Sequence, residues 1–335
     1  MFFQGILFAI VLGAGGPSGQ LAYVSGTEQE DLAACVVDVA TGVLRRVGPG
    51  RRDAAPAWSP DGQWLAFESE PEGGKRSIFL VREDGSELHA LPHAREWNSQ
   101  PRWSSDGRML AYTAEDDDAK PGIMVYDVRA NTETRWGGTE VPLMRPTWLK
   151  NLAIVAIGLT GTAEAVSTDM FRLDPSSATK LVPATLQRYT EWAVEGHPKG
   201  KRIAYESNDG GDREIFVASE LSLKDVSNHR GADWNPVWSP DGQWLAFESF
   251  RTGRRGVYRV FPDTQRVYEV AAAETSDNWS PTWSPDGQWI AYVSDRDGQP
   301  ELYATSLVDG ETKRITDSAA LEYAPAWRPE GRAKK

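Results

Sequence analysis

Short alternations of apolar and polar residues recur along the chain at a fixed interval. The segment W-S-P-D-G-Q-W-[LI]-A-[FY]-x-S occurs three times, at Trp58–Ser69, Trp238–Ser249 and Trp283–Ser294. A looser copy, W-S-S-D-G-R-M-L-A-Y-T-A, runs from Trp103 to Ala114. The first tryptophans of neighbouring copies lie 45 residues apart. This period, with short strands and turn residues, is typical of the four-stranded blade of a β-propeller.

Each repeat predicts four strands, which we call A to D. In the last complete repeat, Pro281–Trp283 is strand A and Gln288–Ser294 is strand B. Glu301–Ser306 follows as strand C and Thr312–Ile315 as strand D. The Ser-Pro-Asp-Gly between A and B predicts a tight turn, because Pro fixes φ and Gly closes the turn.

Counting the B strands gives the number of blades. Seven segments fit: Gln20–Ser25, Trp64–Ser69, Met109–Ala114, Leu152–Ile157, Arg202–Ser207, Trp244–Ser249 and Trp289–Ser294. The first has no A strand before it, and the chain ends with an unpaired A strand, Ala324–Trp327. We therefore predict an all-β, seven-bladed propeller whose C-terminal strand completes the N-terminal blade. Six blades is the alternative, if the poorly matching fourth or fifth repeat is not a blade.

One repeat is degenerate. Trp148 and Trp238 lie 90 residues apart, so a further repeat is expected between them, and Gly196–Ser207 matches it with His197 at the tryptophan position. The recurring tryptophans are expected to fill the layers between blades as structural anchors. These anchors are Trp58, Trp103, Trp148, Trp238, Trp283 and Trp327.

Candidate binding residues lie in the D–A loops, which share one face of a propeller with the B–C loops. Five residues before the anchor, most repeats carry an acid or an amide, and several carry an aromatic residue beside it; the fifth repeat gives Trp192 by this count. Aromatic side chains supply contact area, and polar ones supply direction. The alternative is that the polar residues cap the loop backbone and the tryptophans pack between blades. The predicted binding residues are Asp53, Trp97, Asn98, Asp233, Trp234, Asn278, Trp279, Glu322 and Tyr323.

Catalytic and metal-binding motifs are not apparent in the chain. It contains no G-x-S-x-G, H-E-x-x-H or P-loop sequence, and its four histidines do not cluster. Asp295 and Asp297 in a B–C hairpin are the candidates for Ca²⁺, although Asp-Gly is also a common hairpin turn. We therefore predict no catalytic residue, no cofactor and no other metal site.

Composition narrows the class of partner. With 36 basic and 48 acidic residues the net charge is −12, which argues against nucleic acid or an anionic membrane. A single cysteine, Cys35, excludes an internal disulfide and a cysteine-based metal cluster. We expect a monomer that binds a protein or peptide.

The first 16 residues differ from the repeats. Phe2–Leu12 is apolar and is followed by Gly13-Ala14-Gly15-Gly16, but no Lys or Arg precedes it. The apolar run is too short to span a bilayer and is similar to the core of a signal peptide. It predicts a periplasmic or secreted protein; the alternative is a cytoplasmic protein with a buried N-terminal strand.

The repeat W-S-P-D-G-Q-W-[LI]-A-[FY], followed by S-D-R-D-G-x-P-E-[LI]-Y, resembles the TolB-type propeller repeat, a WD40-like repeat without the WD dipeptide. The resemblance covers Gly19–Arg332, which we expect to form a single propeller domain. It implies a periplasmic, non-enzymatic protein of the cell envelope that binds other proteins. TolB-like proteins carry an α/β domain before a six-bladed propeller, whereas the resemblance here is to the propeller alone, with seven repeats.

Two functions follow from these expectations. The leading hypothesis is a non-enzymatic binding propeller that grips a protein or peptide at the face of the D–A loops. The alternative is an enzyme that acts on carbohydrate or peptide in the channel. Similar propellers occur in oligogalacturonate lyases and beside the hydrolase domain of prolyl-oligopeptidase-like peptidases.

Overall fold

The structure is a computed structural model of the 335-residue chain. The apolar segment Phe2–Leu12 and His93 lie outside the described residues. Those residues are 16–28, 30–70, 75–92, 97–115, 120–162, 165–175, 182–183, 190–200, 202–209, 211–219 and 222–331.

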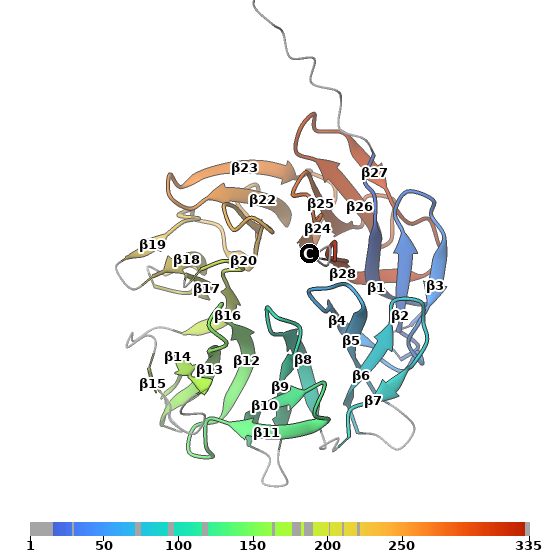
Figure 1. Cartoon of the computed structure of the whole chain (residues 1–335). Coiled ribbons are helices and arrows are strands. Elements are labelled where there is room, and N and C mark those ends of the chain that lie inside the picture. Colours follow the sequence, from blue (N-terminus) through green and yellow to red (C-terminus); the bar gives the residue numbers. More distant parts are fainter. Residues whose placement is uncertain are drawn as a thin grey trace, which may run out of the picture.

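The described strands form seven four-stranded antiparallel sheets arranged in a ring (Figure 1). The seven-bladed prediction is confirmed. Blade two contains β4 (Ala54–Trp58), β5 (Trp64–Ser69), β6 (Ser77–Arg82) and β7 (His89–Ala90). Blade three contains β8 (Asn98–Trp103), β9 (Met109–Glu115), β10 (Pro121–Asp127) and β11 (Thr132–Trp136). Blade four contains β12 (Leu143–Trp148), β13 (Ile154–Thr162), β14 (Ala165–Leu173) and β15 (Val182–Pro183).

The remaining blades repeat this order. Blade five contains β16 (Glu191–Gly196), β17 (Ile203–Ser207), β18 (Glu214–Ala218) and β19 (Leu223–Asp225). Blade six contains β20 (Asp233–Trp238), β21 (Leu245–Ser249), β22 (Gly256–Phe261) and β23 (Arg266–Ala271). Blade seven contains β24 (Asn278–Trp283), β25 (Trp289–Ser294), β26 (Glu301–Ser306) and β27 (Thr312–Arg314).

The ring closes with strands from both ends of the chain. Blade one contains β1 (Gln20–Gly26), β2 (Ala33–Asp38), β3 (Leu44–Arg46) and, as its innermost strand, β28 (Leu321–Trp327). Leu21 pairs with Trp327, and Ser25 pairs with Glu322. The predicted closure is therefore confirmed, with a strand that begins three residues earlier than expected.

Side chains within the repeat close its A–B turn. In blade two, Ser59 Oγ donates to Asp61 Oδ1 at 2.6 Å and accepts from the Trp64 amide at 2.9 Å. Asp61 Oδ1 also accepts from the Gln63 amide at 3.1 Å, and Gly62 has a φ of 68°. Since all partners lie within six residues, the turn is encoded locally. This explains why the motif fixes the positions of the strands.

The anchor tryptophans join neighbouring blades. The Nε1 of Trp103 donates to the carbonyl oxygen of Ala57 at 3.0 Å, and that of Trp148 to Arg102 at 2.8 Å. In each case the acceptor is the residue before the anchor of the preceding blade. Trp103 is half-buried; the buried anchors are Trp58, Trp148, Trp238, Trp283 and Trp327.

Blade five differs from the sequence prediction by one residue. Gly196 pairs with Ile203, as Trp238 pairs with Leu245 in blade six. The anchor position is therefore Gly196, and the sequence-based assignment of His197 to it is wrong.

Packing explains why this position is glycine. A Cβ atom on Gly196 would lie 2.1 Å from the carbonyl oxygen of Trp148, which is far inside van der Waals contact. His197 takes the first position of the following turn instead, and its Nε2 lies 2.9 Å from the carbonyl oxygen of Gly242. The His197 ring also packs edge-on against Trp238, with 4.7 Å between centroids.

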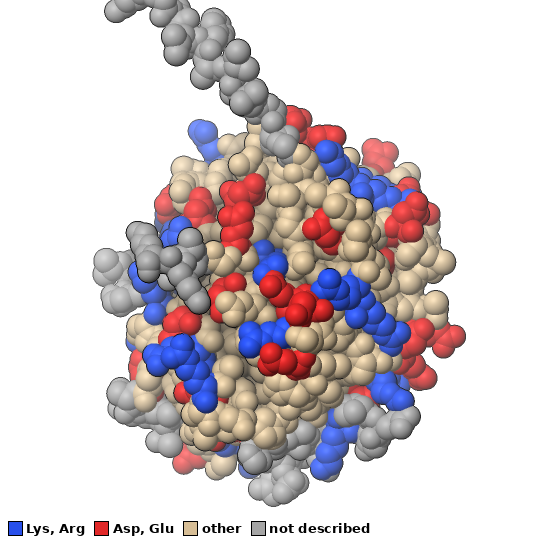
Figure 2. Space-filling view, turned by 45° about the vertical axis from the view of Figure 1, so that its right-hand side comes forward, with Lys and Arg blue, Asp and Glu red and all other residues tan. Residues whose placement is uncertain are grey.

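Charged side chains of both signs are scattered over one face of the molecule. Figure 2 shows acidic and basic residues interspersed over the visible face, without an extended area of one sign.

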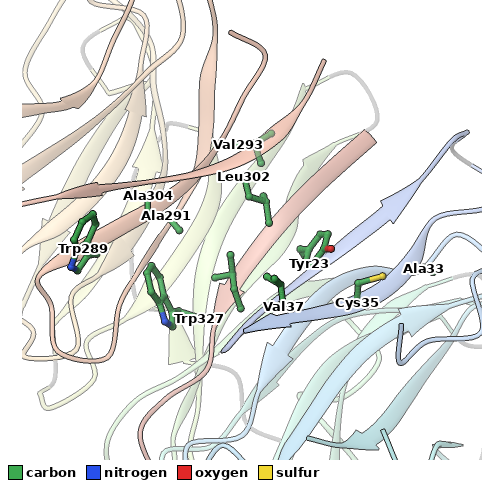
Figure 3. Packing of buried hydrophobic residues seen from close by; sticks show 11 residues of the cluster. Tyr23, Ala33, Cys35, Val37, Trp289, Ala291, Val293, Leu302, Ala304 and Trp327 are labelled. Carbon is green, nitrogen blue, oxygen red and sulfur yellow. The ribbon is translucent and has the colours of Figure 1, made fainter. Parts of the chain in front are cut away.

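The apolar cores lie between blades. Between blades seven and one, Trp289, Ala291 and Leu302 pack with Trp327 and Tyr23 in one buried cluster (Figure 3). The B strands are consequently buried on both faces, and every residue of β25 is buried. Each blade thus depends on its neighbours for burial, as expected for a repeat array.

Candidate binding site at the channel mouth

The innermost strand of each blade, its A strand, lines the central channel (Figure 1). We call the end where these strands begin the channel mouth and the end with the A–B turns the turn end. Leu143 begins β12, whereas the other six A strands carry an acid or amide near their start. These six side chains are all buried: Asp53, Asn98, Glu191, Asp233, Asn278 and Glu322.

Three of them form hydrogen bonds with nearby loops or with strand β2. Asp53 Oδ2 accepts from the amides of Ala34 at 2.9 Å and Gly50 at 3.1 Å. Asn98 Nδ2 donates to the carbonyl oxygen of Arg76 at 2.9 Å. Glu322 Oε1 accepts from Ser318 Oγ at 3.0 Å. The structure therefore places the predicted polar residues beneath the surface of the mouth, where they hold its loops.

In blades six and seven, an arginine from the B–C loop covers the buried polar residue. Arg251 Nη2 lies 3.3 Å from Asp233 Oδ2, and Arg251 Nε donates to Ser249 Oγ at 2.8 Å. Arg296 Nη2 donates to Asn278 Oδ1 at 3.0 Å in the same way. The B–C and D–A loops are thus fixed to each other.

A recurring backbone distortion shapes the mouth. The pairing of strands A and B shifts register just inside the mouth, and the residue at the shift takes a positive φ in six blades. These non-glycine residues are Ala55, Gln100, Arg145, Asn235, Ser280 and Ala324. Such backbone geometry costs about 1–2 kcal/mol per residue. A positive φ at these residues persists where hydrogen bonds offset this free-energy cost.

Buried glutamates provide that compensation in three blades. Gln100 donates its amide to Glu68 Oε1 at 2.7 Å, and Asn235 donates to Glu206 Oε1 at 2.7 Å. Ser280 donates to Glu248 Oε1 at 2.8 Å. Each glutamate belongs to the B strand of the preceding blade, so these charge-assisted bonds also connect blades.

The same glutamates hold arginines at the mouth. Arg76 pairs with Glu68, Arg213 with Glu206 at 3.4 Å, and Arg255 with Glu248 at 2.5 Å. The glutamates are buried, whereas the side chains of Arg213 and Arg255 are 31% and 30% exposed. Each guanidinium is therefore anchored on one side and open to solvent on the other.

Tryptophans alternate with these arginines. Arg213 lies 3.8 Å from the ring centroid of Trp192 and 5.5 Å from that of Trp234. Arg255 lies 5.6 Å from both Trp234 and Trp279. We call this row, Trp192–Arg213–Trp234–Arg255–Trp279, the Trp–Arg ladder. It spans blades five, six and seven, with distances suited to cation–π attraction.

Sequence reasoning found part of this row. Trp234 and Trp279 were predicted binding residues, and the structure brings them together. Because the sequence analysis placed His197 at the anchor position, it aligned Trp192 with the polar residue Asp233. With Gly196 as the anchor, Glu191 corresponds to Asp233 and Trp192 corresponds to Trp234. Arg213 and Arg255 were missed, although each directly precedes a C strand.

The mouth continues toward blades one to three. Trp97 is 43% exposed and lies 4.7 Å from Arg76. Tyr323 and Arg76 both line a cavity of about 680 Å³ that also reaches Arg52 and Asp53. This volume is in the range of small-ligand pockets. Of the nine predicted residues, the four aromatic ones are exposed or half-buried, and the five polar ones are buried.

Two pairs of acidic side chains lie between blades near the mouth. Burial, aided by the Glu301 carboxylate, raises the pKa of Glu322 to about 7. Burial, aided by the Asp233 carboxylate, raises the pKa of Glu214 to about 8 against a 2.6 Å hydrogen bond from Ser227. Each pair therefore retains a proton over part of the neutral range.

The calcium candidates are engaged in other contacts. Asp295 Oδ1 accepts from the Asp277 amide at 2.8 Å, while Asp297 contacts Tyr303 and lies 3.6 Å from Arg314. Across the described ranges, no group of three or more His, Cys, Asp or Glu residues is positioned to hold a metal ion. The described part of the chain likewise has no helix long and apolar enough to cross a membrane.

Comparison with known proteins places this geometry in a family. The family model described as TolB beta propeller domain matches residues 14–196 and 191–334. A protein TolB homolog of Chlorobium chlorochromatii is 27% identical over 140 residues, 40% of this chain and 30% of that protein. A Tol-Pal system protein TolB of Desulfosudis oleivorans is 34% identical over 59 residues, 17% of this chain and 14% of that protein. The matches therefore span less than a third of each relative.

Solved structures share the fold at low identity. The β-propeller domain of the trilobed protease from Pyrococcus furiosus aligns with a TM-score of 0.72 at 15% identity, covering 90% of this chain and 96% of that one. TolB from Acinetobacter baumannii aligns with a TM-score of 0.60 at 16% identity, covering 92% of this chain and 82% of that one. An oligogalacturonate lyase in complex with manganese aligns with a TM-score of 0.64 at 16% identity, covering 89% of this chain and 85% of that one. Repeats, ring and family match agree, and the chain belongs to the TolB beta propeller domain family.

Proposed function

We propose that this protein is a non-enzymatic propeller that binds a protein or peptide at the channel mouth. The observation that carries the proposal is the Trp–Arg ladder, in which half-buried indole rings alternate with guanidinium groups anchored by buried glutamates. Trp and Arg are the residue types most enriched at interface hot spots. Their anchoring reduces the entropy lost on binding.

The chemistry of the ladder favours an extended segment with carbonyl or carboxylate groups. A guanidinium has five N–H donors, and the Glu248 carboxylate occupies only part of those on Arg255. The remaining donors suit main-chain carbonyl oxygens or acidic side chains of a partner. The flanking indole faces suit its apolar side chains.

We further propose that the protein acts in the cell envelope, in the periplasm or secreted. Two observations support this location: the apolar Phe2–Leu12 at the N-terminus and membership of the TolB beta propeller domain family. Immunoblotting of periplasmic, membrane and cytoplasmic fractions tests it. Recovery in the cytoplasmic fraction alone would contradict it.

Affinity capture from the envelope fraction with wild-type bait, followed by mass spectrometry, identifies the partner. The purified partner is then titrated calorimetrically into wild type and into the Trp234→Ala/Trp279→Ala double variant. We expect the double variant to lose about tenfold or more in affinity, as is usual for hot-spot aromatics.

The matched control is Tyr268→Ala, because Tyr268 is 43% exposed on the outer strand β23. It should bind like wild type, and circular dichroism should show all variants folded. Equal affinity of the double variant would remove the mouth as the site. Turnover of an oligogalacturonide or a peptide by the pure protein would contradict the non-enzymatic assignment.

A further inference from the structure

A second cavity, open to solvent, lies at the turn end of the channel, away from the Trp–Arg ladder. This cavity of about 490 Å³ is lined by residues of blades five, six, seven and one. Trp238 and Trp283 contribute to its walls together with prolines of the A–B turns. Its volume and apolar walls match those of small-ligand sites.

Blade five shapes this cavity. Gly196 stands where six other blades place an anchor tryptophan, and it lines the cavity in place of an indole ring. The neighbouring cavity of about 550 Å³ also includes Gly196 and Glu195. At this position the wall of both cavities is therefore backbone and not an indole ring.

The charges of the 490 Å³ cavity are of one sign. Glu195 and Glu330 are its only charged lining residues. Both glutamates also line the adjoining 550 Å³ cavity, together with Arg102, Lys150 and Lys199. The smaller cavity therefore combines aromatic and apolar walls with two carboxylates.

Glu195 is the important group, because its carboxylate has neither a hydrogen bond nor an ion pair among the described residues. Its side chain is half-buried within the channel. Burial raises the pKa of Glu195, and the charge of Arg102 opposes this only in part. Partial burial of a carboxylate without a partner costs free energy, and a bound cation would offset that cost.

We propose that this cavity binds an organic cation, an ammonium or guanidinium group on a short apolar stem, as in a lysine or arginine side chain of a peptide. The cation pairs with Glu195, and the stem packs against Trp238 and Trp283. Indole rings near a desolvated cation add cation–π attraction. This site is separate from the channel mouth and does not depend on the function proposed for it.

The test uses the full chain and two synthetic peptides, Ac-Ala-Lys-Ala-NH₂ and the same peptide with norleucine in place of lysine. Binding is followed by tryptophan fluorescence and by calorimetry. We expect saturable binding of the lysine peptide with a Kd of about 1 mM or lower. The norleucine peptide, which lacks the charge, should bind about tenfold more weakly or not at all.

Four variants locate the site. Glu195→Gln keeps the shape of the side chain and should lower the affinity for the lysine peptide about tenfold. Glu330→Gln should lower this affinity about two- to threefold. Glu311→Gln is the matched control, because the Glu311 side chain is 53% exposed on another part of blade seven. This variant should bind the lysine peptide like wild type. Trp234→Ala/Trp279→Ala should also leave the affinity unchanged, which separates this site from the mouth.

The proposal fails if the lysine peptide shows no saturation up to about 10 mM, or if the norleucine peptide binds equally well. It also fails if Glu195→Gln and Glu330→Gln, both shown to be folded by circular dichroism, bind like wild type. Glu330 is exposed, so its variant tests the site even if Glu195→Gln disturbs the fold.

Discussion

The Nε1 of Trp283 in blade seven donates a hydrogen bond to the backbone carbonyl oxygen of Val237 in blade six, at 3.0 Å. The Trp283 ring is buried between these blades, so one side chain supplies both an apolar and a polar contact. We predict that Trp283→Phe, which retains a ring but loses the donor, lowers the free energy of unfolding by about 1–2 kcal/mol. Trp283→Ala should lower it by about 3–5 kcal/mol.

Urea unfolding followed by circular dichroism measures both changes. Trp97→Ala is the control, because the Trp97 side chain is 43% exposed, and its effect should stay within about 0.5 kcal/mol. Equal stability of Trp283→Phe and wild type would show that the indole hydrogen bond does not hold the blades together.

Gly196 tests the register of blade five. An added Cβ would lie 2.1 Å from the Trp148 carbonyl oxygen, so Gly196→Ala must displace backbone. We expect a loss of about 2–4 kcal/mol, the upper part of the usual range for single substitutions. Gly287→Ala is the comparison: its φ of 70° strains an alanine, but no atom lies within 4 Å of the added Cβ. Thermal melts that rank the two variants equally would contradict the register described here.

The buried acids predict how stability changes with pH. The pKa values of Glu322 and Glu214 are raised from 4.5 to about 7 and about 8. Between about pH 4.5 and 8 the folded protein therefore binds more protons than the unfolded chain, and its stability falls as the pH rises. Below this pH window the stabilisation from the two carboxyl groups is fully present, and above it this stabilisation is lost.

Replacing both acids removes this dependence. The Glu214→Gln/Glu322→Gln double variant should lose less stability than wild type between pH 5 and about pH 8, because glutamine does not titrate. Denaturant unfolding across this range measures the two slopes. Glu311→Gln, at a 53% exposed position, should keep the wild-type slope. Parallel curves for the double variant and wild type would show that these carboxyls are not protonated in the fold.

The ion pairs beneath the Trp–Arg ladder predict a cost for losing the cation. Glu248 is buried, and in the described part of the chain Arg255 is the basic side chain that pairs with it. Arg255→Met keeps an apolar stem but leaves the carboxylate without a positive charge. We expect a loss of about 1–3 kcal/mol, measured by urea unfolding at neutral pH. The exposed Arg266→Met should cost almost nothing. An unchanged midpoint for Arg255→Met would mean that hydrogen bonds alone satisfy Glu248.

Sequence patterns predicted the fold in detail where the interactions are local. The Ser59–Asp61 turn closes through its own side chains, so its motif marks each A and B strand without knowledge of the neighbours. The interval of 45 residues then gave the count of blades and their closure. The prediction failed by one residue at His197, because the degenerate repeat has lost the tryptophan that marks the register.

The candidate site was predicted less completely, because its residues meet only across blades. Arg255 comes from the B–C loop of blade six and reaches Trp279 of blade seven, and no local pattern records that contact. For Asp53 and Asn278 the sequence left open whether the side chain faces a ligand or caps the loop backbone, and the structure shows both side chains buried.

The sequence by itself therefore determined the repeat, its turns, the number of blades and the family, since these depend on contacts within about six residues and on a regular period. The tertiary structure decided which side chains are buried, which arginines face which tryptophans, and why Gly196 takes the place of an anchor tryptophan. Those properties arise from packing one blade against the next, and the alternation along a single strand does not encode them.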